Sequence, residues 1–138
     1  MTAEYNVTDF DDVVSVRNIV RPLNGDVPIA INGYAIQDPE VEGALDVRLG
    51  PFADPSEPAA FRSGDAYWIL DVGPINSAGQ YDYAVVSDSN QSTLYVLVRD
   101  PVTFEAEYER DVLQTLEDQG FTGLLNRPIK TNQENCNY

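Results

Sequence analysis

Carboxylates are the most numerous side chains in this sequence that could do chemistry. One group, Asp9, Asp11 and Asp12, lies in an expected turn. A second group, Asp71, Asp82 and Asp88, lies around the central expected strands. Two carboxylates can perform general acid–base work when a shielded cleft separates their pKa values. Nothing in these spacings indicates such a cleft, so we interpret both groups as solvated turn acids.

Other catalytic and metal-binding chemistries are limited because the chain contains no histidine. Without it the sequence has no Ser-His-Asp triad, no Cys-His pair, none of the usual zinc sites and no histidine-ligated haem. A calcium loop is not indicated either, because neither residues 9–12 nor residues 88–90 space oxygen ligands around a central glycine. The sequence therefore predicts no catalytic residue and no metal site.

Two further features bear on where the protein works. The single cysteine, Cys136, lies third from the end of the sequence. A lone cysteine is often a small buried hydrophobe, whereas one on an exposed tail suggests a missing disulfide partner, and the sequence leaves both readings open. Asn6 and Asn90 each begin an N-glycosylation sequon, which slightly favours a secreted protein.

Length and composition fit one soluble domain over residues 1–138, with 43% apolar and 22% charged residues. No apolar run reaches the ~20 residues of a membrane span, and the N-terminus lacks the basic-then-apolar pattern of a signal peptide. The net charge of −15 would repel nucleic acids and anionic membranes. We therefore expect an extracellular, acidic protein without a nucleic-acid partner.

The apolar patterning predicts strands followed by one helix. Alternation indicates seven strands at residues 2–7, 13–21, 29–36, 44–49, 67–72, 81–87 and 93–98, separated by turns such as Asn24-Gly25. Asp100 and Pro101 are typical of a helix start, and Gly120 is typical of its end. Phe104, Tyr108, Val112 and Leu116, with Leu113, form the apolar stripe of this helix.

This order predicts an all-β fold, because strands joined by short turns pair antiparallel. We expect an up-and-down meander that curls into a barrel, with the single C-terminal helix packed outside. Residues 50–65 form a long connection that contains Pro51, Pro55 and Pro58. Such a connection is either a flap over an opening or a mobile loop without a role, and the sequence does not choose between them.

Several segments are similar to the lipocalin family, in its order and spacing. They are Tyr67-Trp68-Ile69-Leu70, residues 81–86 and residues 95–101. Tyr81-Asp82-Tyr83 resembles the second lipocalin motif, and Arg99 matches the arginine of the third motif. Residues 117–121 and residues 2–5 resemble the helix end and the second strand of the apolipoprotein D and bacterial lipoprotein branch.

The resemblance also implies a part that this sequence lacks. The first lipocalin motif, Gly-X-Trp, is absent, since the sole Trp68 follows Ala66-Tyr67. We therefore expect a lipocalin-like barrel without its first strand, with two unpaired sheet edges. In the branch named above, a cysteine upstream of the segment that matches residues 2–5 pairs with one near the position of Cys136. Arg99 would lose the tryptophan on which it stacks in the family.

The resemblance implies binding and transport of a small hydrophobic ligand inside the barrel, of the retinoid, carotenoid, bilin, fatty acid or sterol class. The only cofactor expected is then a bound chromophore or lipid. One alternative is a subunit of a homo- or hetero-oligomeric pigment–protein assembly that shares a chromophore at a barrel interface, which exposed Phe52 and Phe61 would favour. A third is an isomerase or synthase that acts on an apolar substrate.

Strand alternation selects the side chains expected to line the cavity. Among them Asn18, Asp88 and Tyr95 are polar and would need a partner, which a ligand or a water molecule could supply. For deeper positions such as Val16 and Ile69, ordinary core packing is an equally good reading. The predicted lining consists of Tyr5, Val16, Asn18, Ile31, Gly33, Val47, Leu49, Tyr67, Ile69, Val86, Asp88 and Tyr95.

Overall fold

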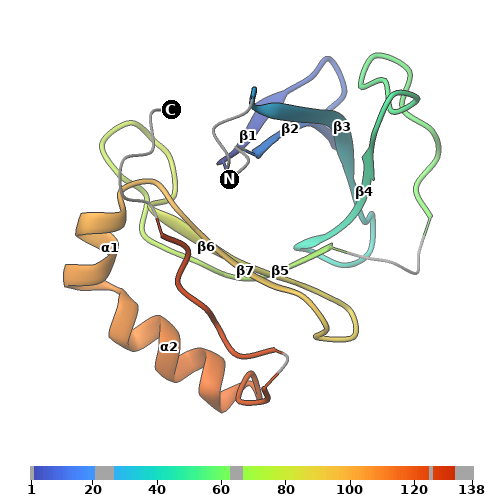
Figure 1. The fold of residues 1–138 in the computed structure, drawn as a ribbon. Helices are drawn as coiled ribbons and strands as arrows, with labels where there is room; N and C mark the ends of the chain where they lie inside the picture. Colours follow the sequence, from blue (N-terminus) through green and yellow to red (C-terminus); the bar gives the residue numbers. More distant parts are fainter. Residues whose placement is uncertain (1, 21–26, 63–66, 125, 133–138) are drawn as a thin grey trace. The chain divides into compact units, whose positions relative to one another are not determined.

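The computed structural model describes residues 2–20, 27–62, 67–124 and 126–132. Within them the chain forms seven strands and two helices (Figure 1). Its contacts divide it into two compact units, residues 1–66 and residues 67–137. The expectation of one domain over residues 1–138 stays a prediction. Cys136, Asn24 and Gly25 lie outside the described residues.

The first unit is an antiparallel meander of four strands. They are β1 (Thr2–Val7), β2 (Val13–Val20), β3 (Ile29–Gln37) and β4 (Ala44–Leu49), each paired with the next along the chain. Side-chain oxygens hold the turns. Thr8 Oγ1 accepts from the backbone N–H of Phe10 at 3.2 Å, and Asp38 Oδ1 accepts from the N–H of Glu40 at 2.8 Å. Such local bonds explain why short polar residues end these strands.

One face of this first sheet is covered by the proline-rich connection. Val13, Tyr34 and Ile36 form a buried cluster there, and Ala53 and Phe61 of the connection pack against it. The described part of the connection, residues 50–62, therefore acts as a cover on this face. Phe61 is thus packed, contrary to the exposure that the pigment-assembly hypothesis expected.

The second unit consists of a three-stranded antiparallel meander and two helices. The strands are β5 (Tyr67–Val72), β6 (Tyr83–Asp88) and β7 (Leu94–Val98), and the helices are α1 (Pro101–Glu107) and α2 (Glu109–Asp118). The helices lie against one face of the sheet (Figure 1). There Val85, Val112, Leu116 and Phe121 form a buried core. Trp68 lies opposite Ser87 and so belongs to this helix-bearing face.

The expectation of one unbroken helix was wrong, because the helix breaks at Tyr108. The backbone there adopts φ −119° and ψ −29°, and the ring packs against those of Tyr83 and Phe104, with centroid distances of 5.5 and 6.5 Å. The predicted start is confirmed, since the Asp100 side chain accepts from the N–H of Val102. The prediction that Leu113 belongs to the packed stripe was wrong. Leu113 is 43% exposed, whereas the other residues of the stripe pack on the core.

The predicted fold class is confirmed. The described strands are antiparallel and follow one another in chain order within each unit, and the helical segment comes last. The strand expected from residue 81 begins only at Tyr83, because Tyr81 forms an isolated bridge with Ile75 instead. In β5 the register shifts between Ile69 and Asp71, which is a β-bulge at Leu70.

Candidate functional site

All the predicted lining residues of the first unit lie on one face of its sheet. One row across the four strands consists of Tyr5, Val16, Gly33 and Leu49, each directly opposite the next. Asn18 is opposite Ile31, and Val47 is opposite Ala35, in flanking rows of the same parity. Because residues that face each other across paired strands project from the same side, these positions share a face.

We call this surface the first apolar face and define it by Tyr5, Val16, Asn18, Ile31, Gly33, Val47 and Leu49. The cover formed by residues 50–62 packs on the opposite face, around Val13, Tyr34 and Ile36. On the first apolar face Val16 is buried, whereas Ile31 and Leu49 are exposed at 42% and 44%. Val14 and Ala35 lie on the same face, as the alternation of their strands predicts. Val7, which is opposite Val14, lies there too and was missed.

Gly33 lies on this face beside the backbone of β4. In the structure a Cβ atom at Gly33 would lie 1.9 Å from the carbonyl oxygen of Arg48 and 2.8 Å from the Cα of Leu49. The glycine therefore permits the close approach of β4 to β3.

The predicted lining residues of the second unit also share a face. Tyr67 is opposite Asp88, while Ile69, Val86 and Tyr95 form one row across β5, β6 and β7. We call these five residues the second apolar face. The helices pack on the other side of this sheet, around Val85 and its neighbours. Ala84 and Leu97 belong to the second apolar face and were missed.

Asp88 has its hydrogen bonds satisfied by the turn that follows β6. Its carboxylate accepts from the N–H groups of Asn90 and Ser92, both at 2.9 Å, and from the hydroxyls of Ser92 and Thr93. These bonds, with those to Ser92 the largest cause, lower the pKa of Asp88 to about 2. The expected need for a ligand partner at Asp88 is therefore met within the chain, and contact of Asp88 with a ligand stays a prediction.

We expect Asp88 to contribute stability that depends on pH. Its pKa falls from 3.8 to about 2 on folding, so the contribution is full above pH 3.8 and is lost as the pH falls toward 2. Asp88→Asn should therefore lower the Tm at pH 7 but leave it almost unchanged near pH 2. Thermal melts across this range test the expectation, with Asp9→Asn as the control. A Tm difference that stayed constant with pH would contradict it.

The structure brings the residues of the two lipocalin-like motifs together at one end of the second unit. Arg99 Nε donates to the carbonyl oxygen of Tyr81 at 2.7 Å, and the Arg99 N–H donates to the carbonyl oxygen of Asp82 at 3.0 Å. The Tyr83 hydroxyl donates to Asp71 Oδ2 at 3.2 Å. Arg99 thus stabilises the motif by donating to the carbonyl oxygens of Tyr81 and Asp82. Sequence reasoning did not anticipate these contacts.

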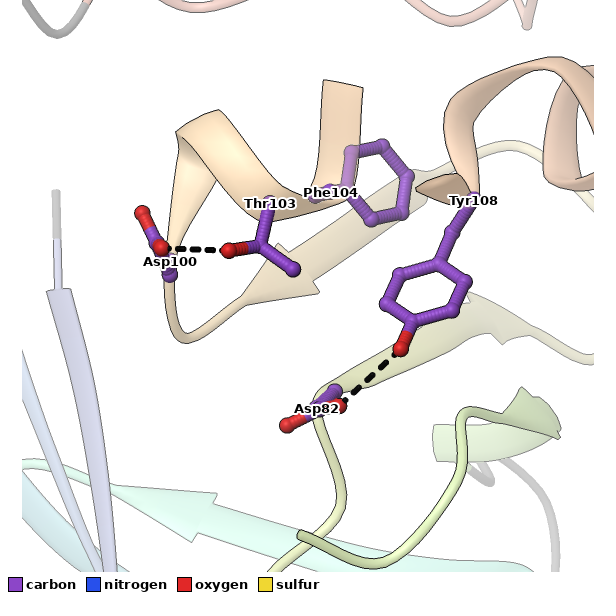
Figure 2. A pocket seen from close by; sticks show the side chains of 5 residues that line it. All are labelled: Asp82, Asp100, Thr103, Phe104 and Tyr108. Carbon is purple, nitrogen blue, oxygen red and sulfur yellow. Dashed lines mark hydrogen bonds between the residues drawn. The ribbon is translucent and has the colours of Figure 1, made fainter. Parts of the chain in front are cut away.

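Asp82 connects three segments of this region. Its Oδ1 accepts from Asn76 Nδ2 at 3.2 Å. Its Oδ2 accepts from the Tyr108 hydroxyl, also at 3.2 Å, and Figure 2 shows this second bond. Burial first, and then this bond to Asp82, raise the pKa of Tyr108. The pocket beside these residues holds about 70 Å³, which is far below the ~300 Å³ of a small-molecule site. We conclude that the motif has a structural role in joining the loop before β6 to the helices.

Among the described residues, no group of three or more His, Cys, Asp or Glu side chains is arranged to hold a metal ion. In the same part of the chain, no helix combines the length and the apolar character that a membrane crossing requires.

A comparison with protein families connects these observations. Residues 1–130 match the family model described as a lipocalin-like domain. The chain belongs to this family. Comparisons with curated proteins and with solved structures gave no match for the lipocalin-like domain.

The family match supports a binding role in general terms. Lipocalin-like domains are generally binding and transport proteins rather than enzymes, and their fold is suited to small hydrophobic molecules. In this lipocalin-like domain, strand alternation placed all twelve predicted lining residues on one face of their own sheet. What alternation did not reveal was the side-chain bonding at Asp88 or the backbone contact at Gly33, because neither leaves a periodic signal.

Proposed function

We propose that this lipocalin-like domain binds and carries a small hydrophobic molecule on its apolar faces. The observation that supports this most strongly is the solvent exposure of large apolar side chains on each of these two faces. Ile31 and Leu49 on the first apolar face, and Ile69 on the second, are all exposed. Contiguous apolar surface of this kind usually marks a binding site in a soluble protein.

The charges of the two faces favour an uncharged ligand. None of the residues that define the faces is basic, and their one acid, Asp88, is occupied by the turn. A carboxylate ligand such as a fatty acid or a bilin would therefore bury its charge without a partner, at a high cost. Among the expected classes, we favour a retinoid alcohol, a carotenoid or a sterol.

Asn18 is one polar residue on these faces that could orient such a ligand. It is half-buried, and the described part of the chain supplies no hydrogen-bond partner for its side chain. Its amide can both donate to and accept from a ligand hydroxyl. A neutral molecule with one hydroxyl or carbonyl group at its end suits this arrangement.

The test begins with the purified chain. An organic extract is examined by absorbance and mass, and retinol is then titrated into emptied protein while its own fluorescence is recorded. We expect Ile31→Gln to weaken retinol binding about tenfold, because burial of one such aliphatic side chain contributes about 1.5 kcal/mol or more. Ile19→Gln makes the same change on the opposite face of the first sheet and should leave the affinity unchanged.

Two results would overturn the proposed contact between the ligand and the first apolar face. If neutral ligands do not bind, or if the two variants weaken binding equally, the first apolar face does not contact the ligand. Tighter binding of fatty acid than of retinol would reject the preference for uncharged molecules.

One observation supports the alternative of a pigment–protein assembly. Phe52 is 98% exposed, whereas Phe61 is packed against the first sheet. An exposed phenylalanine is typical of an interface residue. A mass that rises with protein concentration, together with a visible chromophore in the extract, would support the assembly.

A further inference from the structure

A groove lies on the covered face of the first sheet, on the side opposite to the first apolar face. It holds about 380 Å³, within the range of small-molecule sites. One wall comes from the turn after β1 and the adjoining ends of β2 and β3, and the other comes from residues 58–61 of the connection. We call it the outer groove.

The wall of the outer groove that comes from the connection is held in place by hydrogen bonds. Arg48 Nη2 donates to the carbonyl oxygen of Ala60 at 2.8 Å, and the Ala59 N–H donates to the Tyr34 hydroxyl at 3.0 Å. Arg48 is itself fixed by an ion pair with Asp46, with the Nη2 and Oδ2 atoms 2.6 Å apart. Because the wall is fixed before any ligand arrives, binding costs little ordering entropy.

The lining of the groove is mostly apolar and includes two aromatic rings. Val13 and Ile36 form its floor from the buried cluster of the sheet, and Phe10 and Phe61 contribute rings. Phenyl rings attract cations as well as apolar groups through their electron-rich faces. An apolar body with a positive end therefore suits these walls.

The polar groups of the groove are short of hydrogen-bond donors. The Gln37 side chain donates to the carbonyl oxygens of Asp38 and Val41, at 3.1 and 3.0 Å, which leaves only its oxygen for a ligand. The Gln37 backbone N–H is used by the carbonyl oxygen of Asp12 at 2.8 Å. Pro39 and Pro58 have no N–H to offer.

Among the residues that the structure describes, Asp12 is the only charged one that lines the outer groove. It is exposed, and Asp9 and Asp11 of the same turn add negative charge nearby. An anion would meet repulsion here and few donors, whereas an ammonium group would meet a carboxylate, an amide oxygen and two rings. We propose that the outer groove binds an amphipathic organic cation, in which an apolar or aromatic body carries one protonated amine.

The test uses three probes of similar size and different charge on the full chain. They are 2-phenylethylamine, which is protonated at pH 7, neutral 2-phenylethanol and anionic 3-phenylpropionate. Each is titrated into isotopically labelled protein while backbone amide shifts are recorded by NMR. We expect saturable shifts at Phe10, Asp12, Gln37 and residues 59–61 with the amine. Its affinity should exceed that of the alcohol about fivefold, the size of one exposed ion pair, and should fall with added salt.

Two substitutions in the same turn provide a matched pair. Asp12→Asn should remove the advantage of the amine over the alcohol, whereas Asp11→Asn should retain most of it, because Asp11 does not line the groove. The amide spectrum of each variant confirms that it is folded. The proposal is overturned if the alcohol binds as tightly as the amine, or if Asp12→Asn leaves the amine affinity unchanged. It is also overturned if the amine shifts only residues of the first apolar face, such as Ile31 and Leu49.

Discussion

Gly33→Ala is expected to lower the free energy of unfolding by about 3 kcal/mol or more. The new Cβ atom would lie 1.9 Å from the carbonyl oxygen of Arg48, and the next nearest atoms are also backbone atoms of β4. A flexible side chain could rotate away, but backbone cannot, so β3 and β4 must separate. The pairing of Gly33 with Leu49 and the bond from the Gly50 N–H to the carbonyl oxygen of Asn32 would then be strained or lost.

Urea and thermal unfolding would measure this effect, with a fall in Tm of roughly 10 °C. Asn32→Ala is the control, since it places the same side chain at the adjacent exposed position, where a change of less than about 0.5 kcal/mol is expected. Equal stability of Gly33→Ala and the unsubstituted protein would mean that β4 does not approach β3 this closely.

The second large effect is expected in the core of the second unit. Leu116 in α2 is 1% exposed and packs with Val85, Val112 and Phe121. Leu116→Ala removes three buried carbon atoms and leaves a cavity, which should cost about 3–4 kcal/mol of unfolding free energy. The helix would then lose much of its attachment to the sheet.

Leu113→Ala is a matched control in the same helix. Leu113 is 43% exposed, so the same substitution there should cost less than about 1 kcal/mol. Denaturant melts of both variants, with amide hydrogen exchange of α2, measure the difference. Equal losses for Leu113 and Leu116 would mean that a different face of α2 is packed on the sheet.

The helical segment shows which features the sequence could predict and which it could not. The helix stripe at Phe104, Val112 and Leu116 was visible because packing on one face imposes a spacing of three to four residues. The break at Tyr108 was not visible, because Tyr108 continues the same spacing. At the break the Tyr108 hydroxyl donates to Asp82, which lies 26 residues away in the sequence.

In the candidate site, too, the sequence could predict periodic features but not single contacts. Alternation placed the predicted lining residues on single sheet faces, because a strand has a period of two. It could not show that Asp88 is satisfied by its turn, that Gly33 makes room for backbone, or that Phe61 covers a sheet. Each of those depends on contacts that leave no periodic trace in the chain. The identity of the ligand depends on such contacts as well.

The position of Trp68 has a practical consequence for spectroscopy. This sole tryptophan lies on the helix-bearing face, opposite Ser87, while Ile69, Val86 and Tyr95 project from the other side of the same sheet. Trp68 is 40% exposed. Its emission should change little when a molecule settles among those three side chains, so we expect the sole tryptophan to be nearly silent to occupancy of the second apolar face.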